Sequence, residues 1–288
     1  MSHARVIGQV LLASWFLACS PAPKNPDLDA IIRAGGRVEL DDAQKEVLRV
    51  IFDEQSHPTG TELQALSRFP SLHALLLTGS PISDADLVRV GALGQLQWLE
   101  LGDTKVTDVG LESLERLNQL QTLSLSGTGV SDAGLAHLGA LPQLQFLDLT
   151  STKVTDAGLE SLAGLPQLKT LKLDRTSVNG SGLERLKGVT SLRTLSLAST
   201  PMNDQGLSHL ASLTSVQSLQ LGDTEVTDAG IMHLAPVKGL KFLAVSRTFV
   251  TDDGVGEFLK VLPGVIIPSR VRRGVEFPKE GQTKSDSK

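Results

Sequence analysis

Aromatic residues are scarce in this sequence, which contains no tyrosine and has only 3% aromatic residues over its 288 positions. Enzyme pockets are usually lined by hydrophobic and aromatic side chains. Leucine is abundant instead, and there are 27 glycines. This composition argues against an enzyme that must build a shaped pocket.

An excess of positive charge is also missing. The 27 Lys and Arg residues are outnumbered by 32 Asp and Glu residues, which gives a formal net charge of -5. Nucleic-acid-binding proteins usually show a concentrated basic surface. The charge balance therefore argues against a nucleic-acid partner.

Cysteine occurs once, at Cys19, so an internal disulfide is excluded. This residue follows an apolar run from Val6 to Leu17, which is too short to cross a bilayer. The pattern predicts a signal peptide over 1–18.

The end of this signal resembles a bacterial lipobox, in which Cys19 becomes the lipidated first residue. Phe16 stands where an ordinary signal peptidase prefers a small residue, although Phe16 and Leu17 also depart from the usual lipobox residues. Simple secretion and an uncleaved anchor are the alternatives. The Pro-rich residues 19–27 predict a linker that separates the lipid from the folded body.

A 24-residue repeat fills most of the sequence without an insertion. Its rows begin at Leu72, Leu96, Leu120, Leu144, Leu168, Leu192, Val216 and Leu240. They share the pattern L-x-x-L-x-L-x-x-T-x-V-T-D-A-G-L-x-x-L-x-x-L-P-x, and a fixed period of this length is typical of stacked repeats. We therefore predict one solenoid with eight repeats over 72–263.

Each row predicts one strand, one turn and one helical segment. In "LQWLEL" and "LQFLDL" the apolar residues alternate as in a short strand. The second half, such as "DAGLESLAGL" from Asp156 to Leu165, spaces leucines by three, as in a short helix with one buried stripe. A single row cannot cover both of its flanks, so the rows must stack.

Less regular segments flank the repeats and are predicted to cap them. Residues 28–71 are the predicted N-terminal cap, which ends in a degenerate repeat. Its expected inward residues are Leu48, Ile51, Leu63, Leu66 and Phe69. Before it, "DAIIRAGGRVELDD" indicates a short helix, a turn at Gly35-Gly36 and a strand. Residues 264–276 are predicted as a C-terminal cap strand, and 277–288 as a disordered tail.

From Leu48 to Ile267 the chain resembles a leucine-rich repeat protein. Its "T-x-V-T-D-A-G-L" rows are similar to the bacterial GALA and ribonuclease-inhibitor-like subclass, although Thr or Ser replaces the usual Asn or Cys at the ninth position. The resemblance implies an α/β horseshoe solenoid with a parallel concave sheet and short convex helices. It also implies that the chain binds a protein and has no cofactor.

Thr, Asp and Gly recur at fixed row positions, as in "TKVTDVGLESL" from Thr104 and its copy from Thr152. A catalytic group is needed once, so we interpret these repeated residues as scaffold. We expect the Thr hydroxyls to bond to backbone groups at the turn and to form a ladder through neighbouring coils, and the Gly residues to let adjacent coils approach.

The repeated Asp carboxylates are expected to bind backbone N–H groups as helix N-caps. They are Asp108, Asp132, Asp156, Asp204, Asp228 and Asp252. Gly180 takes this position in the fifth row, which should therefore be the most weakly capped. One carboxylate per row is too few for calcium, which needs six to eight oxygens.

Three histidines share one row position, at His137, His209 and His233. No third ligand accompanies them, so we interpret them as solvated helix residues rather than a zinc site. The sequence shows no catalytic triad and no Gly-rich phosphate loop. We therefore predict no catalytic, cofactor-binding or metal-binding residue.

Residues that do not repeat are the candidates for a binding site. The third, fifth and seventh row positions are expected to point outward onto the concave sheet, where aromatic residues occur beside charges, as in binding hot spots. The candidate protein-binding residues are Trp98, Glu100, Phe146, Asp148, Lys172, Asp174 and Arg175. Alternatively, the aromatic residues only shelter the sheet. A second candidate surface is the ridge after the strands, with Asp103, Lys105, Lys153, Arg175, Asp223 and Arg247.

The sequence thus predicts a monomeric, non-catalytic protein-protein interaction module. We expect it to be exported and anchored in the bacterial cell envelope through lipidated Cys19, with a secreted or periplasmic protein as the alternative. An envelope structural or glycan-contacting protein and a secreted leucine-rich repeat effector are the rival functions. GALA-type effectors carry an F-box, and residues 20–47 are too few for that domain and a linker.

Overall fold

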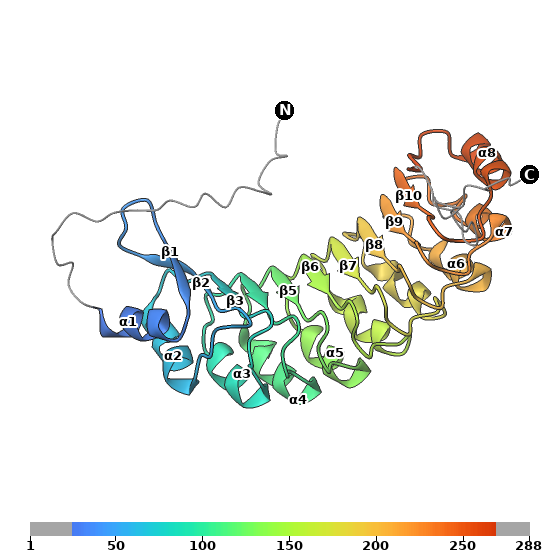
Figure 1. Cartoon of the computed structure of the whole chain (residues 1–288). Coiled ribbons are helices and arrows are strands. Elements are labelled where there is room, and N and C mark those ends of the chain that lie inside the picture. The colour runs from blue at the N-terminus through green and yellow to red at the C-terminus, as the bar shows by residue number, and fades with distance from the viewer. Residues whose placement is uncertain (1–24, 269–288) are drawn as a thin grey trace, which may run out of the picture.

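The computed structural model describes residues 25–268, which form one curved solenoid (Figure 1). Ten strands make a single sheet in chain order from β1 to β10. The strands line the concave side and the helices lie on the convex side (Figure 1). The predicted leucine-rich repeat architecture is therefore confirmed. The predicted signal, Cys19 and the predicted tail lie outside the described residues.

The concave sheet is built from short parallel strands, one per 24-residue coil. They are β3 Ala74–Leu76, β4 Trp98–Glu100, β5 Thr122–Ser124, β6 Phe146–Asp148, β7 Thr170–Lys172, β8 Thr194–Ser196, β9 Ser218–Gln220 and β10 Phe242–Ala244. Trp98 pairs with Thr122, and Thr122 pairs with Phe146. Equivalent row positions of adjacent coils therefore lie side by side. We number the coils 1 to 8 from the one that starts at Leu72.

The convex segments are short helices of two kinds. The α-helices are α3 Asp84–Val90, α4 Asp108–Leu111, α5 Asp132–Leu138, α6 Asp204–Leu210, α7 Asp228–Met232 and α8 Asp252–Val261. The 3-10 helices are η2 Glu112–Arg116, η3 Gly158–Gly164 and η4 Leu183–Gly188. In coils 4 and 5, η3 and η4 are the only helical segments within the described residues.

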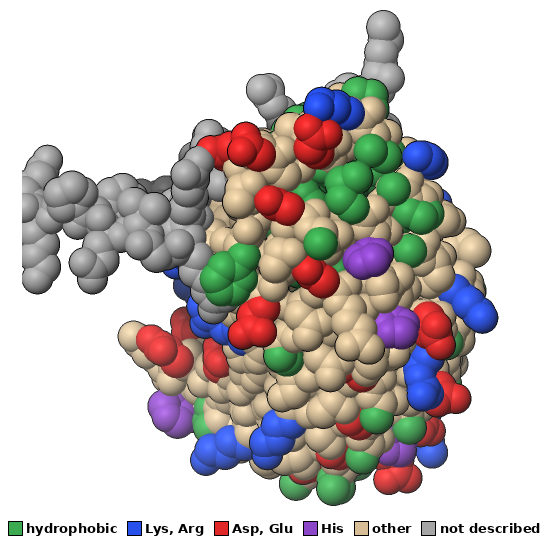
Figure 2. Space-filling view, turned by 90° about the vertical axis from the view of Figure 1, so that its right-hand side faces the viewer, with side chains coloured by type: hydrophobic (Ala, Val, Ile, Leu, Met, Phe, Trp, Pro, Cys, Tyr) green, Lys and Arg blue, Asp and Glu red, His purple; other side chains and the backbone are tan. Residues whose placement is uncertain are grey.

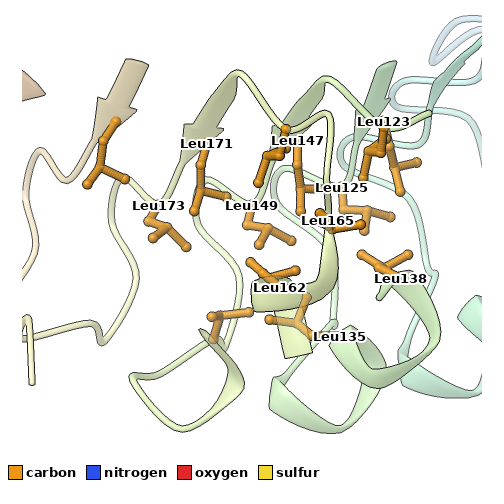
Figure 3. Packing of buried hydrophobic residues seen from close by; sticks show 14 of the residues in the cluster. Leu123, Leu125, Leu135, Leu138, Leu147, Leu149, Leu162, Leu165, Leu171 and Leu173 are labelled. Carbon is orange, nitrogen blue, oxygen red and sulfur yellow. The ribbon is translucent and has the colours of Figure 1, made fainter. Parts of the chain in front are cut away.

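Leucines fill the space between the sheet and the helices. Figure 3 shows Leu123, Leu147 and Leu171 beneath three successive strands, with Leu135 and Leu162 facing them from the helical side. All five side chains have no exposed surface. Full burial of a leucine side chain stabilises a fold by about 1.5–3 kcal/mol. Stacking of the coils supplies this burial on both flanks of each row.

A hairpin and a helix close the N-terminal end of the solenoid. This cap contains α1 Pro26–Arg33, β1 Arg37–Leu40, β2 Val47–Ile51, α2 Gly60–Ala65 and η1 Leu66–Arg68. β1 pairs with β2 in the antiparallel direction, so the free edge of the first coil is covered. The predicted helix, turn and strand are present, but α1 begins at Pro26, inside the segment expected to be a linker.

The strand of the degenerate repeat has a different register from the predicted one. The buried residues of this repeat include Val47, Val50, Phe52, Leu63, Leu66 and Phe69. The predicted inward residues Leu48 and Ile51 are only half-buried, because Arg49 pairs with Ala74 at a step of 25 residues instead of 24. A shift of one residue exchanges the two faces of a strand. In the predicted register, the side chain of Asp53 would have pointed into the core.

The repeated Asp carboxylates bind the next coil. Oδ1 of Asp132 accepts the N–H of Thr155 at 2.8 Å, and Oδ2 accepts the Thr155 hydroxyl at 2.6 Å. The same two bonds join Asp84 to Thr107, Asp108 to Ser131, Asp204 to Thr227 and Asp228 to Thr251. The residue before each Asp, such as Ser131, is the N-cap of the helix. The predicted N-cap role of Asp is therefore wrong, because its carboxylate crosses to the neighbouring coil.

The repeated threonines bond to the backbone at the turn, as predicted, but each bond stays within its own coil and does not link neighbouring coils as the expected ladder would. The Thr152 hydroxyl donates to the carbonyl of Leu149 at 2.6 Å. The same bond to the carbonyl three residues earlier is made by Ser80, Thr104, Thr128, Thr176, Thr200, Thr224 and Thr248. All these side chains are buried, so the bonds satisfy carbonyl groups that would otherwise lie in the core without a partner.

The ladder of Asp bonds is interrupted between coils 5 and 6. Asp156 still reaches coil 5 and accepts N–H groups from Asn179 at 2.7 Å, Gly180 at 3.0 Å and Gly182 at 2.7 Å. Gly180 stands at the Asp position of coil 5 and has no carboxylate that could accept hydrogen bonds from coil 6. Asn203 of coil 6 instead accepts the N–H of Gly206 with its own side chain at 3.0 Å. η4 begins without a side-chain cap, but α4, α5 and η3 do so too, so the lack of a cap does not set coil 5 apart as predicted.

We expect Ser56→Ala to raise the pKa of Asp53 in the N-terminal cap. The Ser56 hydroxyl and the N–H of Gln55 donate to this carboxylate at 3.0 and 3.1 Å, and they hold its pKa below the ordinary 3.8. A lowered folded-state pKa stabilises the fold above the unfolded pKa, and this contribution is lost as the pH falls through the folded value. An NMR titration of the Asp53 carboxyl measures the shift.

Asp41 is the internal control for this titration. The N–H groups of Glu46 and Lys45 lower its pKa, and Ser56 does not contact it. The Asp41 pKa should therefore stay unchanged in Ser56→Ala. An unchanged Asp53 pKa would show that the Ser56 hydroxyl does not stabilise the carboxylate.

Candidate protein-binding face

Two aromatic side chains stand on the concave sheet, separated by one strand. Trp98 in β4 and Phe146 in β6 both lie beside Thr122 in β5. Two strand steps correspond to roughly 10 Å. Trp98 is 37% exposed, and Phe146 is half-buried. The aromatic pair is therefore accessible from the concave side.

Charged groups hold Trp98 in place from both sides. Its Nε1–H donates to Oε1 of Glu100 at 2.9 Å, and the Arg49 guanidinium lies 5.3 Å from the ring centroid. Arg49 also pairs with Glu39 at 3.2 Å. A cation over an aromatic ring contributes about 0.5–2 kcal/mol. The indole is thus fixed in one orientation while part of its surface stays open to solvent.

Phe146 is part of a second cluster of the same kind. Nζ of Lys172 lies 5.2 Å from the Phe146 ring centroid and 3.2 Å from Oδ2 of Asp148. The N–H of Thr150 donates to the other oxygen of Asp148 at 3.0 Å. Each cluster therefore combines one aromatic ring, one cation and one carboxylate. We call these groups the Trp98 cluster (Arg49, Trp98, Glu100) and the Phe146 cluster (Phe146, Asp148, Lys172).

The last two candidate residues lie outside both clusters. Oδ1 of Asp174 accepts the Ser196 hydroxyl at 2.5 Å and the Ala198 N–H at 2.7 Å, so its carboxylate joins coils 5 and 6. Arg175 is exposed and has a φ of 55° at the turn after β7. Five of the seven predicted residues are therefore brought into two clusters, and the other two are not.

Sequence reasoning missed Arg49. The structure places Arg49, Ala74 and Trp98 in one column across β2, β3 and β4. Ala74 is small and fully buried, which lets the guanidinium reach over it to the indole ring. Nε of Arg49 is buried and has no hydrogen-bond partner within the described residues. The predicted register concealed this column, because it turned the wrong residues of β2 outward.

The surface beside Glu100 is hollowed and acidic. The hollow has a volume of about 690 Å³ and extends from the Trp98 cluster to the N-terminal cap. Its charged lining residues are Arg37, Asp53, Glu54, Glu100 and Asp103. Four carboxylates against one guanidinium give this hollow a negative potential, which favours a cationic group from a partner.

The second candidate surface is the ridge formed by the turns that follow the strands. Asp103, Ser151, Arg175, Ser199, Asp223 and Arg247 all have positive φ angles there. Arg247 pairs with Asp223 at 2.7 Å. Lys105 and Lys153 belong to isolated bridges that lead toward the helices. Apart from the Arg247 ion pair, the structure does not gather the ridge candidates into a cluster.

Two of the three histidines of the shared row position lie beside carboxylates of the helical side. Nδ1 of His137 is 2.6 Å from Glu115, and that of His209 is 3.8 Å from Glu184. Over residues 25–268, no group of three or more His, Cys, Asp or Glu side chains could hold a metal ion. Along the same stretch, none of the helices has the length and apolar character needed to cross a membrane.

Comparison with known proteins identifies the family of this solenoid. The leucine-rich repeat region family matches residues 54–270, which is most of the chain. The chain belongs to the leucine-rich repeat family. Leucine-rich repeat domains typically serve as non-enzymatic binding scaffolds. No curated protein matches this leucine-rich repeat chain.

Solved structures share the fold of this leucine-rich repeat protein. An internalin (inlF) of Listeria monocytogenes matches with a TM-score of 0.59 at 20% identity, over 86% of this chain and 75% of that chain. Internalin C2 of the same organism matches with a TM-score of 0.57 at 27% identity, over 74% and 85% of the two chains. The ectodomain of the Arabidopsis thaliana receptor kinase GASSHO1/SCHENGEN3, in complex with Casparian strip integrity factor 2, matches with a TM-score of 0.53 at 19% identity, over 74% of this chain and 28% of that chain.

Proposed function

We propose that this leucine-rich repeat protein is a non-catalytic module that binds a protein partner on its concave face. The observation that carries the proposal is the pair of aromatic–cation–carboxylate clusters on a sheet whose outward residues in β5, β8 and β9 are polar. Large aromatic side chains that are held in place and remain accessible are typical of binding hot spots. The matching ectodomain of GASSHO1/SCHENGEN3 was solved in complex with Casparian strip integrity factor 2, which supports use of the fold as a binding module.

Rigidity of the face favours binding. The backbone of each strand is bonded to both neighbours, and the two rings are already fixed by Arg49 and Lys172. Ordering of side chains and loops on binding usually costs about 0.5–1.5 kcal/mol per immobilised side chain. A face that is ordered before the partner arrives avoids most of this cost.

The acidic hollow beside Glu100 favours a partner that carries Lys or Arg at this end of the interface. Such a contact between exposed charges is screened over about 8 Å at physiological salt. The hollow therefore steers the partner, while the aromatic residues supply most of the affinity. We also infer that the solenoid acts as a monomer, with the concave face left open for the partner.

Replacement of Trp98 and Phe146 together by Ala should abolish capture of the partner. Each truncation removes a large aromatic surface at the centre of the proposed interface, and hot-spot truncations cost at least about 2 kcal/mol each. Affinity purification from the native envelope compares the wild-type chain with Trp98→Ala/Phe146→Ala. Phe242→Ala is the matched control, because Phe242 occupies the same row position in β10, outside both clusters.

A partner retained by the Phe242→Ala control and lost by the double variant supports the concave face. If every captured protein stays bound to the double variant, binding occurs elsewhere and the proposal is overturned. Circular dichroism of both variants excludes unfolding as the cause of lost binding. If a carbohydrate array is bound and no protein is captured, the glycan-contacting alternative replaces the protein-binding one.

We also propose that the chain is exported and that Cys19 carries a lipid anchor. The support is the apolar run before this lone cysteine and the Pro-rich segment after it. Metabolic labelling with a palmitate analogue should mark the wild-type protein, and Cys19→Ala should lose the label and leave the membrane fraction. Ser20→Ala is the control and should keep the label. Equal labelling of wild type and Cys19→Ala would exclude lipidation at this residue.

A further inference from the structure

Glutamines recur along one edge of the solenoid, where each coil passes into the next. They stand at the last row position of coils 1 to 4 and at the second row position of coils 2 to 4. We call this set the glutamine band, and its residues are Gln95, Gln97, Gln119, Gln121, Gln143, Gln145 and Gln167. All of them are exposed or half-buried, whereas the leucines between them, such as Leu96 and Leu120, are fully buried. The band therefore faces solvent along the edge at which the strands begin.

The backbone holds the glutamines of successive coils in register. The carbonyl of Gln97 accepts the N–H groups of Gln121 and Thr122 at 2.8 and 3.0 Å. The carbonyl of Gln121 accepts those of Gln145 and Phe146 at the same two distances, 2.8 and 3.0 Å. Equivalent glutamines are thus one coil apart, which is about 4.8 Å at the sheet. The side chains take no part in these bonds, so they form a regular row on a rigid support.

Most amide groups of the band are free to bind a ligand. Stacked glutamines can form ladders of hydrogen bonds with each other, but no two glutamine side chains are bonded to each other within residues 25–268. Gln95 donates an amide N–H to the Phe69 carbonyl at 3.3 Å, and Gln145 accepts from Nζ of Lys169 at 2.9 Å. The other amides of the band make no hydrogen bond to the described part of the chain. Attachment of one coil to the next therefore does not explain the band.

The surface at the N-terminal end of the band is hollowed and carries no formal charge. This hollow has a volume of about 450 Å³ and is lined by Gln95, Gln97 and Gln119 together with Ser71 and His73. None of its lining residues is Asp, Glu, Lys or Arg. Acidic and basic side chains are scattered over the surface at the α8 end, which faces the viewer in Figure 2. Neutrality is therefore a property of this edge and not of the surface in general.

The band covers only the first half of the solenoid. In later coils, Arg193 and Lys241 stand at the second row position, and Ser191 stands at the last position of coil 5. The sheet continues beyond the band and ends in a single bridge at Ile266, in place of the longer cap strand predicted over 264–276. A scaffold role would require glutamine in every coil, as it does for the repeated threonines. The glutamines of coils 1 to 4 therefore indicate a local function.

We propose that the glutamine band binds an uncharged, β-linked polysaccharide that lies along this edge of the sheet. A carboxamide offers both donors and an acceptor without a charge, which suits the hydroxyl groups of sugars. Each ring of an extended β-linked chain advances by nearly one coil spacing, so successive rings meet successive glutamines. The band has no aromatic anchor of the kind that protein partners use, and it has no cations for nucleic acid.

A polymer suits the band better than a single sugar. Each hydrogen bond to an uncharged hydroxyl replaces a bond to water, so its net contribution to affinity is small. Several coils that hold one chain raise the affinity together, because every contact after the first is intramolecular. The band lies beside the concave face rather than on it, so this inference is independent of the protein partner proposed above.

Isothermal titration calorimetry of the full-length chain with cellohexaose and N-acetylchitohexaose tests the proposal. Both are uncharged β-linked hexasaccharides, and at least one of them should bind about tenfold more tightly than its own disaccharide, because the longer chain contacts several coils. Maltohexaose is the control for geometry, since it has the same length but α linkages that curve the chain away from a straight row. It should bind at least about tenfold more weakly than the better β-linked hexasaccharide.

Truncation of two adjacent glutamines tests the place of binding. Gln97→Ala/Gln121→Ala should weaken binding of the hexasaccharide about tenfold, because two amide contacts are lost. The fold should be retained, since the carbonyl groups of these residues, and not their side chains, bond to the next coil. Gln217→Ala is the matched control, because Gln217 occupies the same row position in coil 7, outside the band. This variant should bind the hexasaccharide as tightly as the wild-type chain.

Three results would overturn the proposal. The first is that neither β-linked hexasaccharide binds, or that maltohexaose binds as tightly as the better of the two. The second is equal binding by the wild-type chain and Gln97→Ala/Gln121→Ala. The third is loss of the hexasaccharide in Trp98→Ala/Phe146→Ala, which would place the sugar on the concave face. If that variant keeps the sugar and loses its protein partner, the two surfaces act separately, as proposed.

Discussion

Gly158→Ala is expected to destabilise the solenoid by about 2–3 kcal/mol, the usual cost of forcing extra atoms into a packed site. A Cβ at residue 158 would collide with Oδ1 of Asp132 and would lie 3.0 Å from Cδ1 of Leu135. The Asp132 oxygen cannot retreat, because it holds the N–H of Thr155. A glycine-to-alanine change in an ordinary helix has the opposite sign and stabilises by about 0.5–1 kcal/mol.

Gly158→Ala should lower the free energy of unfolding much less in a chain that also carries Asp132→Ala. Removal of the carboxylate takes away the closest contact of the new Cβ and leaves Cδ1 of Leu135 and the Cα of residue 132 at 3.0 and 3.1 Å, so the two changes should be non-additive. A double-mutant cycle from chemical denaturation gives this coupling free energy directly. Gly164→Ala is the control at the other end of η3, where the nearest atom to a new Cβ is 3.6 Å away. If Gly158→Ala lowers the free energy of unfolding equally with and without the Asp132 carboxylate, the carboxylate is not the reason that glycine is needed at residue 158.

Asp156→Ala should lower the free energy of unfolding by about 3 kcal/mol, since bonds to charged groups contribute about 1.5–3 kcal/mol each and are not additive. This carboxylate serves three backbone N–H groups, and Gly180 and Gly182 are buried residues. Without the carboxylate, their N–H groups lose a partner that water cannot easily replace. Asp204→Ala is the matched control and should cost less, because Asp204 accepts one backbone N–H and one hydroxyl from Thr227.

The loss of stability should be concentrated at the junction of coils 4 and 5, which the Asp156 bonds hold together next to the interruption of the Asp ladder. Repeat proteins are stabilised by contacts between neighbouring coils, so a weakened junction can open while the rest stays folded. In Asp156→Ala, hydrogen exchange should accelerate most in η4 and least in α3. An unfolding free energy equal to that of Asp204→Ala would contradict the special role assigned to Asp156.

The period of the sequence alone determined the fold. Leucines at fixed positions of a 24-residue row defined the strands, the helices and the core, because each row repeats the same local alternation. The turn role of the threonines followed as well, since their bonds stay within one coil. The repeated glycines and the outward positions of Trp98 and Phe146 were predicted for the same reason.

Only the tertiary structure decided which side chains meet across coils. Asp132 bonds to Thr155, 23 residues later, whereas in the sequence it stands next to Ser131. That partner becomes a neighbour only when the coils stack. The register of β2 likewise depended on excluding Asp53 from the core, and this register placed Arg49 over Trp98. A repeat specifies local geometry within each row, while contacts between rows depend on the offset at which the rows stack.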